Sequence, residues 1–259
     1  MIRYLVLGVV QGITEFLPIS SSGHLVLAQR FLGIDPPGVL LEALLHWGTL
    51  AAILVVFRSD LAALARSLTP RGTIEGRKEI GLIAAATVPI VVLGLLLRSS
   101  IGTLFASLTV LGACFLATGL LLALTGVIHR RAQRNQAGFV DALGVGLAQA
   151  AAILPGLSRS GATIAAGVFS GLTPRRAARF SFLVAIPALF GAGVLSLWDA
   201  VRSGASAPWG GLAVGTVAAF VVGLLAIKTL LALVSSGRLW TFSIYCVSVG
   251  IAVLVCATL

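Results

Sequence analysis

Apolar residues run along this chain in blocks that are long enough to cross a lipid bilayer. A helix of about 20 residues spans the hydrocarbon core, and six blocks approach or exceed that length. They lie at roughly 40–57, 80–97, 104–125, 180–198, 210–234 and 240–257. The pattern therefore predicts an all-α integral membrane protein with six transmembrane helices.

Two further apolar stretches, 4–33 and 140–171, are interrupted by polar residues. Each contains a Leu-Pro pair followed by serine and glycine, and proline ends or kinks a helix. Broken backbone at membrane depth is tolerated only where protein or a water-filled cavity covers it. We therefore expect each stretch to form a re-entrant helix pair, which enters the membrane and returns to the same side.

The two interrupted stretches resemble each other, with a slip of one residue inside the shared pattern. The first contains Gln11, Leu17-Pro18 and Ser20–Gly23, and the second contains Gln149, Leu154-Pro155 and Ser158–Gly161. Their offset of about 138 residues is close to half of the chain. We expect one membrane domain over 1–259, with repeat one at 1–125 and repeat two at 140–259. Three spans per repeat invert the second copy, and such inverted repeats place their site near the midplane.

Composition agrees with the membrane class and limits the partners. The 259 residues are 58% hydrophobic and 10% charged, with a mean hydropathy of +1.09, far from soluble usage. The net charge of +10 would suit nucleic acid in a soluble protein, but the apolar bulk excludes that partner. Three cysteines in apolar runs, without paired spacing, predict neither a disulfide framework nor a zinc site.

The basic residues are distributed unevenly over the predicted topology. One side receives Arg58, Arg66, Arg71, Arg77, Lys78, Arg130, Arg131, Arg134, Arg175, Arg176, Arg179 and Arg238. The other side receives Arg3, Arg30, Arg98 and Arg202. Because basic residues accumulate in cytoplasmic loops, the first side is predicted to be cytoplasmic. The first pair then enters from outside, and the second pair enters from the cytoplasm.

Few ionisable groups are left at membrane depth, and such groups are functional candidates because each is costly unless paired. They are Glu15, His24, Glu42, His46, Arg159 and Lys228. Glu42 and His46 lie four apart on the first span, where they line a cavity or form a polar contact between helices, and the contact is favoured. The long side chain of Lys228 is expected to reach towards the interface.

The first interrupted stretch collects amide, carboxylate, hydroxyl and imidazole groups. Gln11 and Glu15 are four apart and share a helix face, which suits either a hard cation such as Mg²⁺ or Ca²⁺ or a bridge between helices. The spacing does not decide between these two. Ser20, Ser21 and Ser22 follow the break, where hydroxyls and free N–H groups form a seat for phosphate.

His24 follows this serine run, and its imidazole can accept or donate a proton in the same pocket. The second stretch supplies an anion clamp: Arg159 offers a planar fork of donors for phosphate oxygens. In a purely structural role, Arg159 would instead neutralise Glu15. The neighbouring phosphate-binding candidates are Ser158, Ser160, Gly161 and Thr163.

At these motifs the chain closely resembles the undecaprenyl-diphosphate phosphatase family, the integral-membrane type linked to bacitracin resistance. The stretch Gln11–His24 resembles its glutamate-rich first motif, and Pro155–Thr163 resembles its second. Leu41–Thr49 is similar to a third, weaker segment, in which Glu42 stands at a usually acidic position. The resemblance covers essentially the whole chain.

The resemblance implies removal of the terminal phosphate from a C55 polyprenyl diphosphate, which recycles the lipid carrier of cell-wall synthesis in the bacterial plasma membrane. It also implies a divalent cation, and it makes Glu15, Ser21, His24 and Arg159 the catalytic set. Gln11 stands here where some relatives have glutamate, which weakens the case for a two-carboxylate metal site.

The resulting hypothesis is phosphoryl transfer in a midplane pocket, with Ser21 facing Arg159. Ser21 attacks the terminal phosphorus after activation by Glu15 or His24, and His24 as the nucleophile stays open. A transporter or flippase of a lipid phosphate is the alternative, because inverted repeats with broken helices are typical of transporters. Association into a homodimer is left open.

Overall fold

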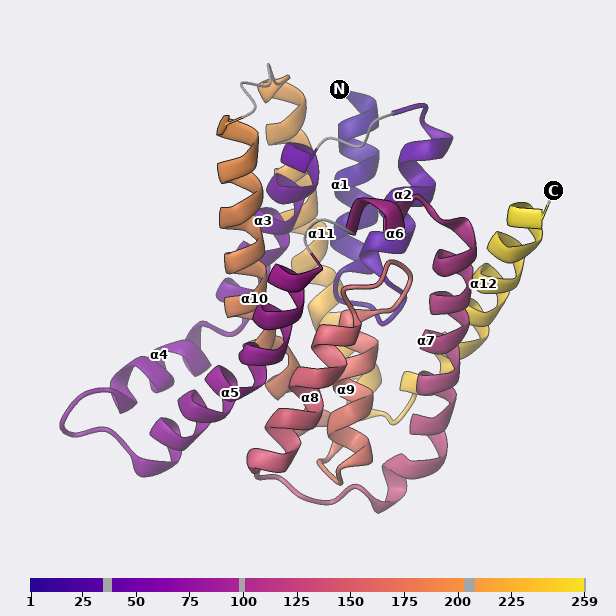
Figure 1. Cartoon of the computed structure of the whole chain (residues 1–259). Coiled ribbons are helices and arrows are strands. Elements are labelled where there is room, and N and C mark those ends of the chain that lie inside the picture. The colour runs from indigo at the N-terminus through magenta and orange to yellow at the C-terminus, as the bar shows by residue number, and fades with distance from the viewer. Residues whose placement is uncertain (35–38, 98–100, 203–207, 259) are drawn as a thin grey trace.

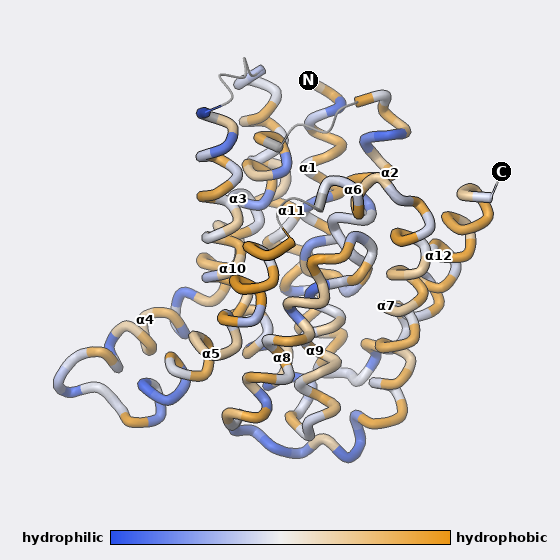
Figure 2. The backbone as a smooth tube through the Cα atoms, viewed as in Figure 1, coloured by the Kyte–Doolittle hydropathy of each residue, from blue (hydrophilic) through white to orange (hydrophobic). Residues whose placement is uncertain are grey.

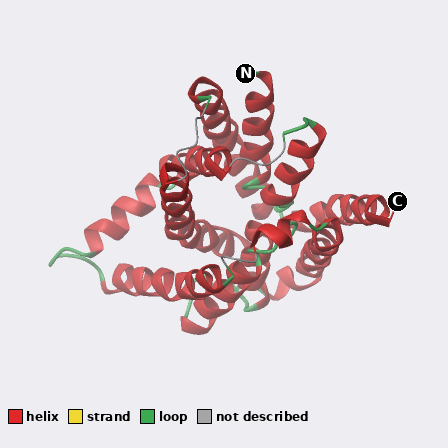
Figure 3. Ribbon diagram, turned by 45° about the horizontal axis from the view of Figure 1, so that its top comes forward, coloured by secondary structure: helices red, strands yellow, loops and turns green. Residues whose placement is uncertain are grey.

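The computed structural model describes residues 1–34, 39–97, 101–202 and 208–258 (Figure 1). Within these ranges the chain is built from helices and short connections, without a named strand (Figure 3). One isolated bridge joins Arg134 and Leu172.

Six long helices coincide with the six predicted spans. They are α3 (Val39–Val56), α5 (Ile74–Leu96), α7 (Leu108–Ile128), α10 (Pro174–Arg202), α11 (Trp209–Ser235) and α12 (Phe242–Thr258). Helices α5, α7, α10 and α11 are long and apolar enough to cross a membrane. Helix α12 is so together with the 3-10 turn Leu239–Thr241 that precedes it, and α3 is so together with α4, across a bend of 73°. Exposed apolar side chains such as Leu120, Val217 and Ile244 face outward from these helices, as lipid-facing residues do. The prediction of an all-α, multi-pass membrane protein is confirmed.

The two interrupted stretches fold as two pairs of half-helices. The first pair is α1 (Ile2–Thr14) and α2 (Ser21–Phe31), and the second is α8 (Phe139–Ala151) and α9 (Arg159–Phe169). Both α1 and α8 have 13 residues, so each rises about 20 Å and cannot cross about 30 Å of hydrocarbon. In Figure 1 one pair occupies the upper half and the other the lower half, with both breaks near the middle.

The packing partners repeat between the two halves of the chain. Helix α1 packs on α11, and its counterpart α8 packs on α5. Helices α3 and α10 pack on each other, as do α7 and α12. An inverted repeat produces this exchange of partners, because the first half-helix of each pair then contacts the second long span of the other copy. The division into 1–125 and 140–259 stays a prediction.

The predicted basic side gathers at one end of the bundle, which is the lower end in Figure 2. Arg176 pairs with Glu79, and Arg179 pairs with Asp60, so α10 holds the α4–α5 hairpin. Arg134 binds both oxygens of Asp141, at 3.1 and 2.7 Å. Of the four basic residues expected at the other end, Arg98 lies outside the described residues.

The segment 58–79 lies between the first two predicted spans, and the expectation that it is a loop is wrong over most of its length. Helix α4 covers Arg58–Ser67, and α5 already begins at Ile74. The run Leu61–Ala65 consists of strong helix formers, and Thr73 caps α5 by accepting from Gly76 N. Three shorter elements complete the described part of the chain: helix α6 (Ile101–Ala106) and two 3-10 turns, at His129–Arg131 and Leu239–Thr241.

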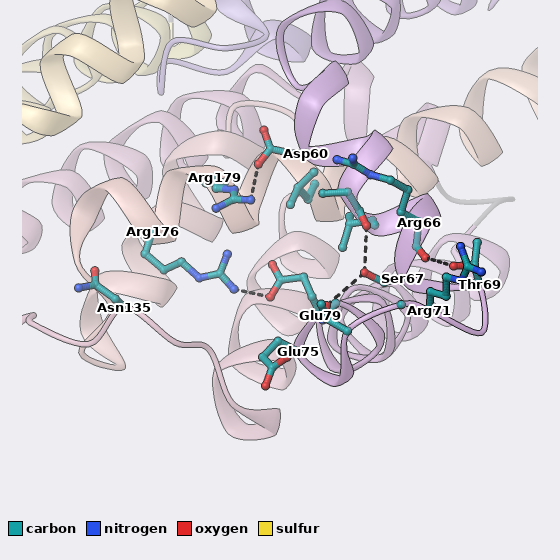
Figure 4. A pocket seen from close by; sticks show the side chains of 16 residues that line it. Asp60, Arg66, Ser67, Thr69, Arg71, Glu75, Glu79, Asn135, Arg176 and Arg179 are labelled. Carbon is teal, nitrogen blue, oxygen red and sulfur yellow. Dashed lines mark hydrogen bonds and ion pairs between the residues drawn. The ribbon is translucent and has the colours of Figure 1, made fainter.

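A charged pocket of about 540 Å³ lies beneath the α4–α5 hairpin (Figure 4). Its walls include the two ion pairs from α10, together with Arg66, Arg71 and Asn135. None of the predicted site residues lines this pocket. The pocket therefore belongs to the basic end and not to the polar cluster between the helix breaks.

Candidate active site

Glu15 is the point at which the two helix breaks meet. It follows the last residue of α1 and is only 5% exposed. Its Oε2 accepts hydrogen bonds from Ser21 Oγ at 2.6 Å and from Gln11 Nε2 at 3.1 Å. Its Oε1 forms an ion pair with Nη2 of Arg159, from the first turn of α9. One carboxylate thus joins α1, α2 and α9.

The predicted pair Ser21 and Arg159 therefore lies on the two oxygens of the same carboxylate. Arg159 Nη1 is buried and has no hydrogen-bond partner among the described residues. A buried donor without a partner costs about 1–3 kcal/mol, and an oxygen of a ligand would remove this cost. Arg159 forms an ion pair with Glu15, as the structural alternative predicted, and its role as an anion clamp stays a prediction.

A serine caps the start of each helix that follows a break. Ser20 Oγ accepts from Gly23 N at the start of α2, and Ser158 Oγ accepts from Gly161 N at the start of α9. The other N–H groups of each first turn have no helical partner, and the positive end of each helix dipole lies beside them. The two helix starts therefore concentrate anion-binding groups at the junction.

Ser20 is in a strained conformation, with φ of 72°. Among the described residues, Ser20 is the one non-glycine residue with a positive φ. This conformation costs roughly 1–3 kcal/mol and is often found at functional sites. Its carbonyl oxygen accepts from His24 N at 3.2 Å and also lies 2.7 Å from His24 Nδ1. The strained residue therefore holds both the helix start and the imidazole.

His24 points away from Ser21 and towards α12. Its Nε2 lies 2.6 Å from the hydroxyl of Tyr245, and its ring stacks on the Tyr245 ring at 5.7 Å. Phe115 of α7 packs edge-on against the imidazole. In this arrangement Glu15, and not His24, is the group hydrogen-bonded to the Ser21 hydroxyl.

Three further phosphate-binding candidates lie in the first turns of the two helices, Ser22 in α2 and Ser160 and Gly161 in α9. Ser22 Oγ lies 3.3 Å from Ser20 Oγ and stays close to the start of α2. Ser160 Oγ donates to the carbonyl of Leu17 at 3.3 Å, which ties the second break to the first. Gly161 is packed against the first break, since an added Cβ would lie 3.3 Å from Pro18 Cβ.

Thr163 is directed to a neighbouring helix and not to Glu15. Its Oγ1 donates to the carbonyl of Arg159 at 2.7 Å and lies 2.5 Å from Ser181 Oγ of α10. Its contact with the polar cluster is thus through the backbone of Arg159. It fixes the first turn of α9 against α10.

The polar residues of α3 divide between the two roles that the sequence allowed. Glu42 Oε1 accepts from Gln29 Nε2 at 3.2 Å, which is the polar contact between helices α2 and α3. His46 Nε2 lies 3.7 Å from Glu15 Oε2 and so belongs to the cluster. Lys228 is exposed on α11, away from these groups.

Gln11 and Glu15 are the residues predicted to hold a cation, and the amide oxygen of Gln11 is the one of their oxygens that has no partner among the described residues. Gln11 Oε1 is buried and has no hydrogen-bond partner among the described residues, beside the carboxylate that Gln11 Nε2 contacts. The described residues contain no group of three or more His, Cys, Asp or Glu that could hold a metal ion. A cation here would therefore take two protein oxygens and complete its shell with water and substrate oxygens, as Mg²⁺ usually does.

Several residues of the site gave no clear signal in the sequence. Thr118 of α7 accepts from Ser158 N at 3.0 Å and donates to the carbonyl of Gly156 at 3.0 Å, which stabilises the second break. Tyr245 lies in an apolar span that contains no motif. Gln149, the counterpart of Gln11, is buried with both amide atoms unpartnered among the described residues. Only the repeat pattern pointed to this glutamine.

Comparisons with known proteins agree over almost the whole chain. The family model described as bacitracin resistance protein BacA matches residues 4–252. The undecaprenyl-diphosphatase of Desulforapulum autotrophicum is 42% identical over 261 residues, covering 95% of this chain and 94% of the relative. The undecaprenyl-diphosphatase of Desulfosudis oleivorans is 44% identical over 270 residues, covering 96% of each chain. That of Syntrophotalea carbinolica is 44% identical over 252 residues, covering 95% of each.

Proposed function

The chain belongs to the family of the bacitracin resistance protein BacA, and on that premise we propose that it is an undecaprenyl-diphosphatase. It removes the terminal phosphate of undecaprenyl diphosphate and leaves the monophosphate in the membrane. The observation that carries this function is the buried junction of Ser21, Glu15 and Arg159. Relatives more than 40% identical over nearly their full length carry the same name, which favours hydrolysis over transport.

Ser21 is the nucleophile, and Glu15 is its general base. The 2.6 Å hydrogen bond from Ser21 Oγ to Glu15 Oε2 places an acceptor on the proton that must leave before attack. Glu15 is held in this position by Gln11 and Arg159. His24 has its Nε2 directed to Tyr245, so the geometry favours Ser21 over His24 as the attacking group.

The electrostatic part of the site comes from the second break and from both helix starts. Arg159 Nη1 is a buried donor without a partner among the described residues, and in this proposal it binds an oxygen of the diphosphate. The uncapped N–H groups of α2 and α9 bind further phosphate oxygens. Because these donors are already oriented, they stabilise charge that develops on the phosphoryl oxygens without reorganising.

The reaction proceeds in two displacements. Ser21 Oγ attacks the terminal phosphorus, its proton passes to Glu15, and the bond from that phosphorus to the bridging oxygen breaks. The bridging oxygen leaves with its electron pair on undecaprenyl monophosphate. This group needs no added proton, because a phosphate monoester has a second pKa of about 6. Glu15 then releases its proton to water.

In the second displacement Glu15 takes a proton from a water molecule, whose oxygen attacks the phosphorus of the phosphoserine. The bond from phosphorus to Ser21 Oγ breaks, and the proton on Glu15 returns to Ser21. The products are inorganic phosphate and undecaprenyl monophosphate. Every side chain in this scheme comes from one chain, so a second copy is not required to complete the site.

A divalent cation, Mg²⁺ or Ca²⁺, is part of the proposal. Gln11 Oε1 and Glu15 would hold it, since both are hard oxygen ligands. When bound, it supplies positive charge that offsets the negative charge of the diphosphate. The two residues also orient each other without it, through the amide–carboxylate hydrogen bond.

The protein is a multi-pass membrane protein, and its orientation follows from charge. The basic end, with the α4–α5 hairpin and the connection from α7 to α8, faces the cytoplasm of a bacterial plasma membrane. The first break then enters from the outer side, and the second enters from the cytoplasm. The prenyl chain of the substrate stays between helices in the lipid, where apolar side chains are exposed.

The first experiment measures phosphate released from undecaprenyl diphosphate by the purified protein in detergent, where transport between compartments is impossible. We expect one inorganic phosphate for each undecaprenyl monophosphate formed. Absence of both products, across Mg²⁺ and Ca²⁺, would overturn the proposed hydrolase. The same assay run over these metals tests the cation.

The second experiment separates the nucleophile from other serines. Ser21→Ala should reduce turnover by about 10³-fold or more, because it removes both the attacking oxygen and the proton that Glu15 accepts. Ser243→Ala on α12, a buried serine outside the cluster, is the matched control and should retain near-normal turnover. Comparable rates for the two variants would exclude Ser21 as the nucleophile.

A further inference from the structure

Tyr245 joins the last helix of the chain to the first helix break. It lies on α12, 221 residues after His24, and its hydroxyl is 2.6 Å from His24 Nε2. The two rings are also stacked, with centroids 5.7 Å apart and planes inclined by 10°. This double contact is specific, since both a polar atom and a ring face of the same residue meet the imidazole.

The hydrogen bonds of His24 assign a role to each ring nitrogen. Nδ1 lies 2.7 Å from the carbonyl oxygen of Ser20, and a carbonyl can only accept, so Nδ1 carries a proton. In the neutral ring Nε2 is then the acceptor, and the Tyr245 hydroxyl donates to it. Phe115 closes a third side of the imidazole. The ring therefore cannot turn without losing two hydrogen bonds.

The surroundings of Tyr245 explain why this bond is strong. Its side chain is 44% exposed on a helix whose neighbouring side chain Ile244 is 65% exposed, so this face of α12 meets lipid. A hydroxyl in an apolar environment is costly unless it is hydrogen-bonded, and water does not compete for it there. The Tyr245 hydroxyl thus has one partner, His24 Nε2, among the described residues.

We infer that Tyr245 is a positioning residue for the phosphatase reaction, which orients the imidazole of His24 by donating to its Nε2. This inference rests on the proposed function, because it requires the imidazole of His24, three residues after Ser21, to take part in the phosphatase reaction. Ser20 determines which nitrogen carries the proton, and Tyr245 determines where the other nitrogen lies. The third point of attachment, Phe115, fixes the ring plane.

The test is Tyr245→Phe, which removes the hydroxyl and keeps the stacked ring. We expect kcat for phosphate release to fall about fivefold to tenfold, the size of one hydrogen bond, with KM nearly unchanged. Tyr4→Phe is the matched control, because Tyr4 is the other tyrosine of the chain and lies on α1, packed near Gly211. A kcat within about twofold of wild type for Tyr245→Phe would overturn the inference.

A spectroscopic signature separates positioning from a general effect on packing. The chain has three histidines, so ¹⁵N labelling of histidine gives few ring signals, and His46→Gln and His129→Gln assign the other two. Loss of the Tyr245 hydroxyl should shift the His24 Nε2 signal and leave the His129 signals in place. An unchanged Nε2 signal would mean that the hydrogen bond is absent in the membrane protein.

A double-mutant cycle completes the test. Tyr245→Phe should have no further effect on kcat in a His24→Gln protein, because its action passes through the imidazole; additive losses would contradict this. The ring signals also distinguish the two hypotheses. If wild-type protein releases no phosphate but Nε2 still responds to Tyr245→Phe, the proposed function fails and the hydrogen bond stands.

Discussion

The two helix breaks have the same plan and different chemistry. Each has a buried glutamine before the break, a Leu-Pro pair, a serine cap and a glycine in the first turn of the following helix. The first residue of the new helix is Ser21 in one break and Arg159 in the other. Both reach the same carboxylate, Glu15. The two similar breaks thus bring the proposed nucleophile and a guanidinium together at equivalent positions.

The counterpart of Glu15 shows why the two breaks are not interchangeable. Counting four residues from each glutamine gives Glu15 in the first break and Ile153 in the second. His24 likewise corresponds to Ala162, three residues after each of the two first helical residues. The first break therefore holds the carboxylate and imidazole that we propose as acid–base groups, and the second supplies positive charge. One carboxylate is enough, because it is shared.

The breaks also differ by one residue in length, and this changes their strain. One residue separates Pro18 from the cap Ser20, whereas two residues separate Pro155 from the cap Ser158. In the longer break Gly156 takes the positive φ, at 92°, and Ser158 is extended with φ of −68°. In the shorter break Ser20 itself takes φ of 72°. The strained non-glycine residue therefore lies in the break to which we assign the acid–base chemistry.

The positive charge that the second break supplies is tested by Arg159→Lys, whose expected effect is smaller than that of Ser21→Ala but larger than those of the substitutions that follow. A lysine ammonium is a point charge and cannot bind Glu15 and a phosphate oxygen with separate nitrogens. We expect phosphate release to fall about 10²-fold, the loss of one oriented donor in the transition state. The ion pair of Arg176 with Glu79 at the basic end provides the control, and Arg176→Lys should leave turnover near normal. Equal losses would mean that Arg159 acts as a structural ion pair only.

A second substitution tests the rigidity of the longer break. In Gly156→Ala the alanine would have to adopt a positive φ, and its Cβ would lie only 2.4 Å from the carbonyl oxygen of Leu111. The free energy of unfolding should therefore fall by at least about 2 kcal/mol. Thermal unfolding in detergent measures this loss. Gly144→Ala on α8 is the control, because its Cβ meets nothing within 4 Å, and alanine should gain up to about 1 kcal/mol there. If Gly156→Ala is as stable as wild type, the second break does not depend on a glycine with a positive φ, and its extra residue is not explained by that conformation.

The sequence was sufficient for the architecture because apolar length and Leu-Pro breaks are local signals. The sequence also grouped Glu15, Ser21 and Arg159, because ionisable and polar residues at membrane depth are costly unless they contact one another. It could not place Tyr245, because nothing near that tyrosine in the chain indicates that α12 packs beside His24. The orientation of His46 towards Glu15, and not towards a helix contact alone, likewise depends on how α3 packs. Helix α4 was missed because its arginines indicated a charged loop more strongly than its alanine and leucine residues indicated a helix.

The smallest expected effect has opposite signs in the two breaks and isolates the strain. Ser20→Gly removes the strain at this position, because glycine adopts a positive φ freely. Glycine is also nearly as good a helix cap as serine, so the free energy of unfolding should change by about 0 to +1 kcal/mol. Ser158→Gly relieves no strain, because Ser158 is already extended, and it should lose about 0.5–1 kcal/mol from the greater freedom of the unfolded chain. Thermal unfolding of both variants in the same detergent makes the comparison. If both variants lose stability equally, Ser20 is not strained, and the difference in length between the two breaks has no energetic consequence for the site.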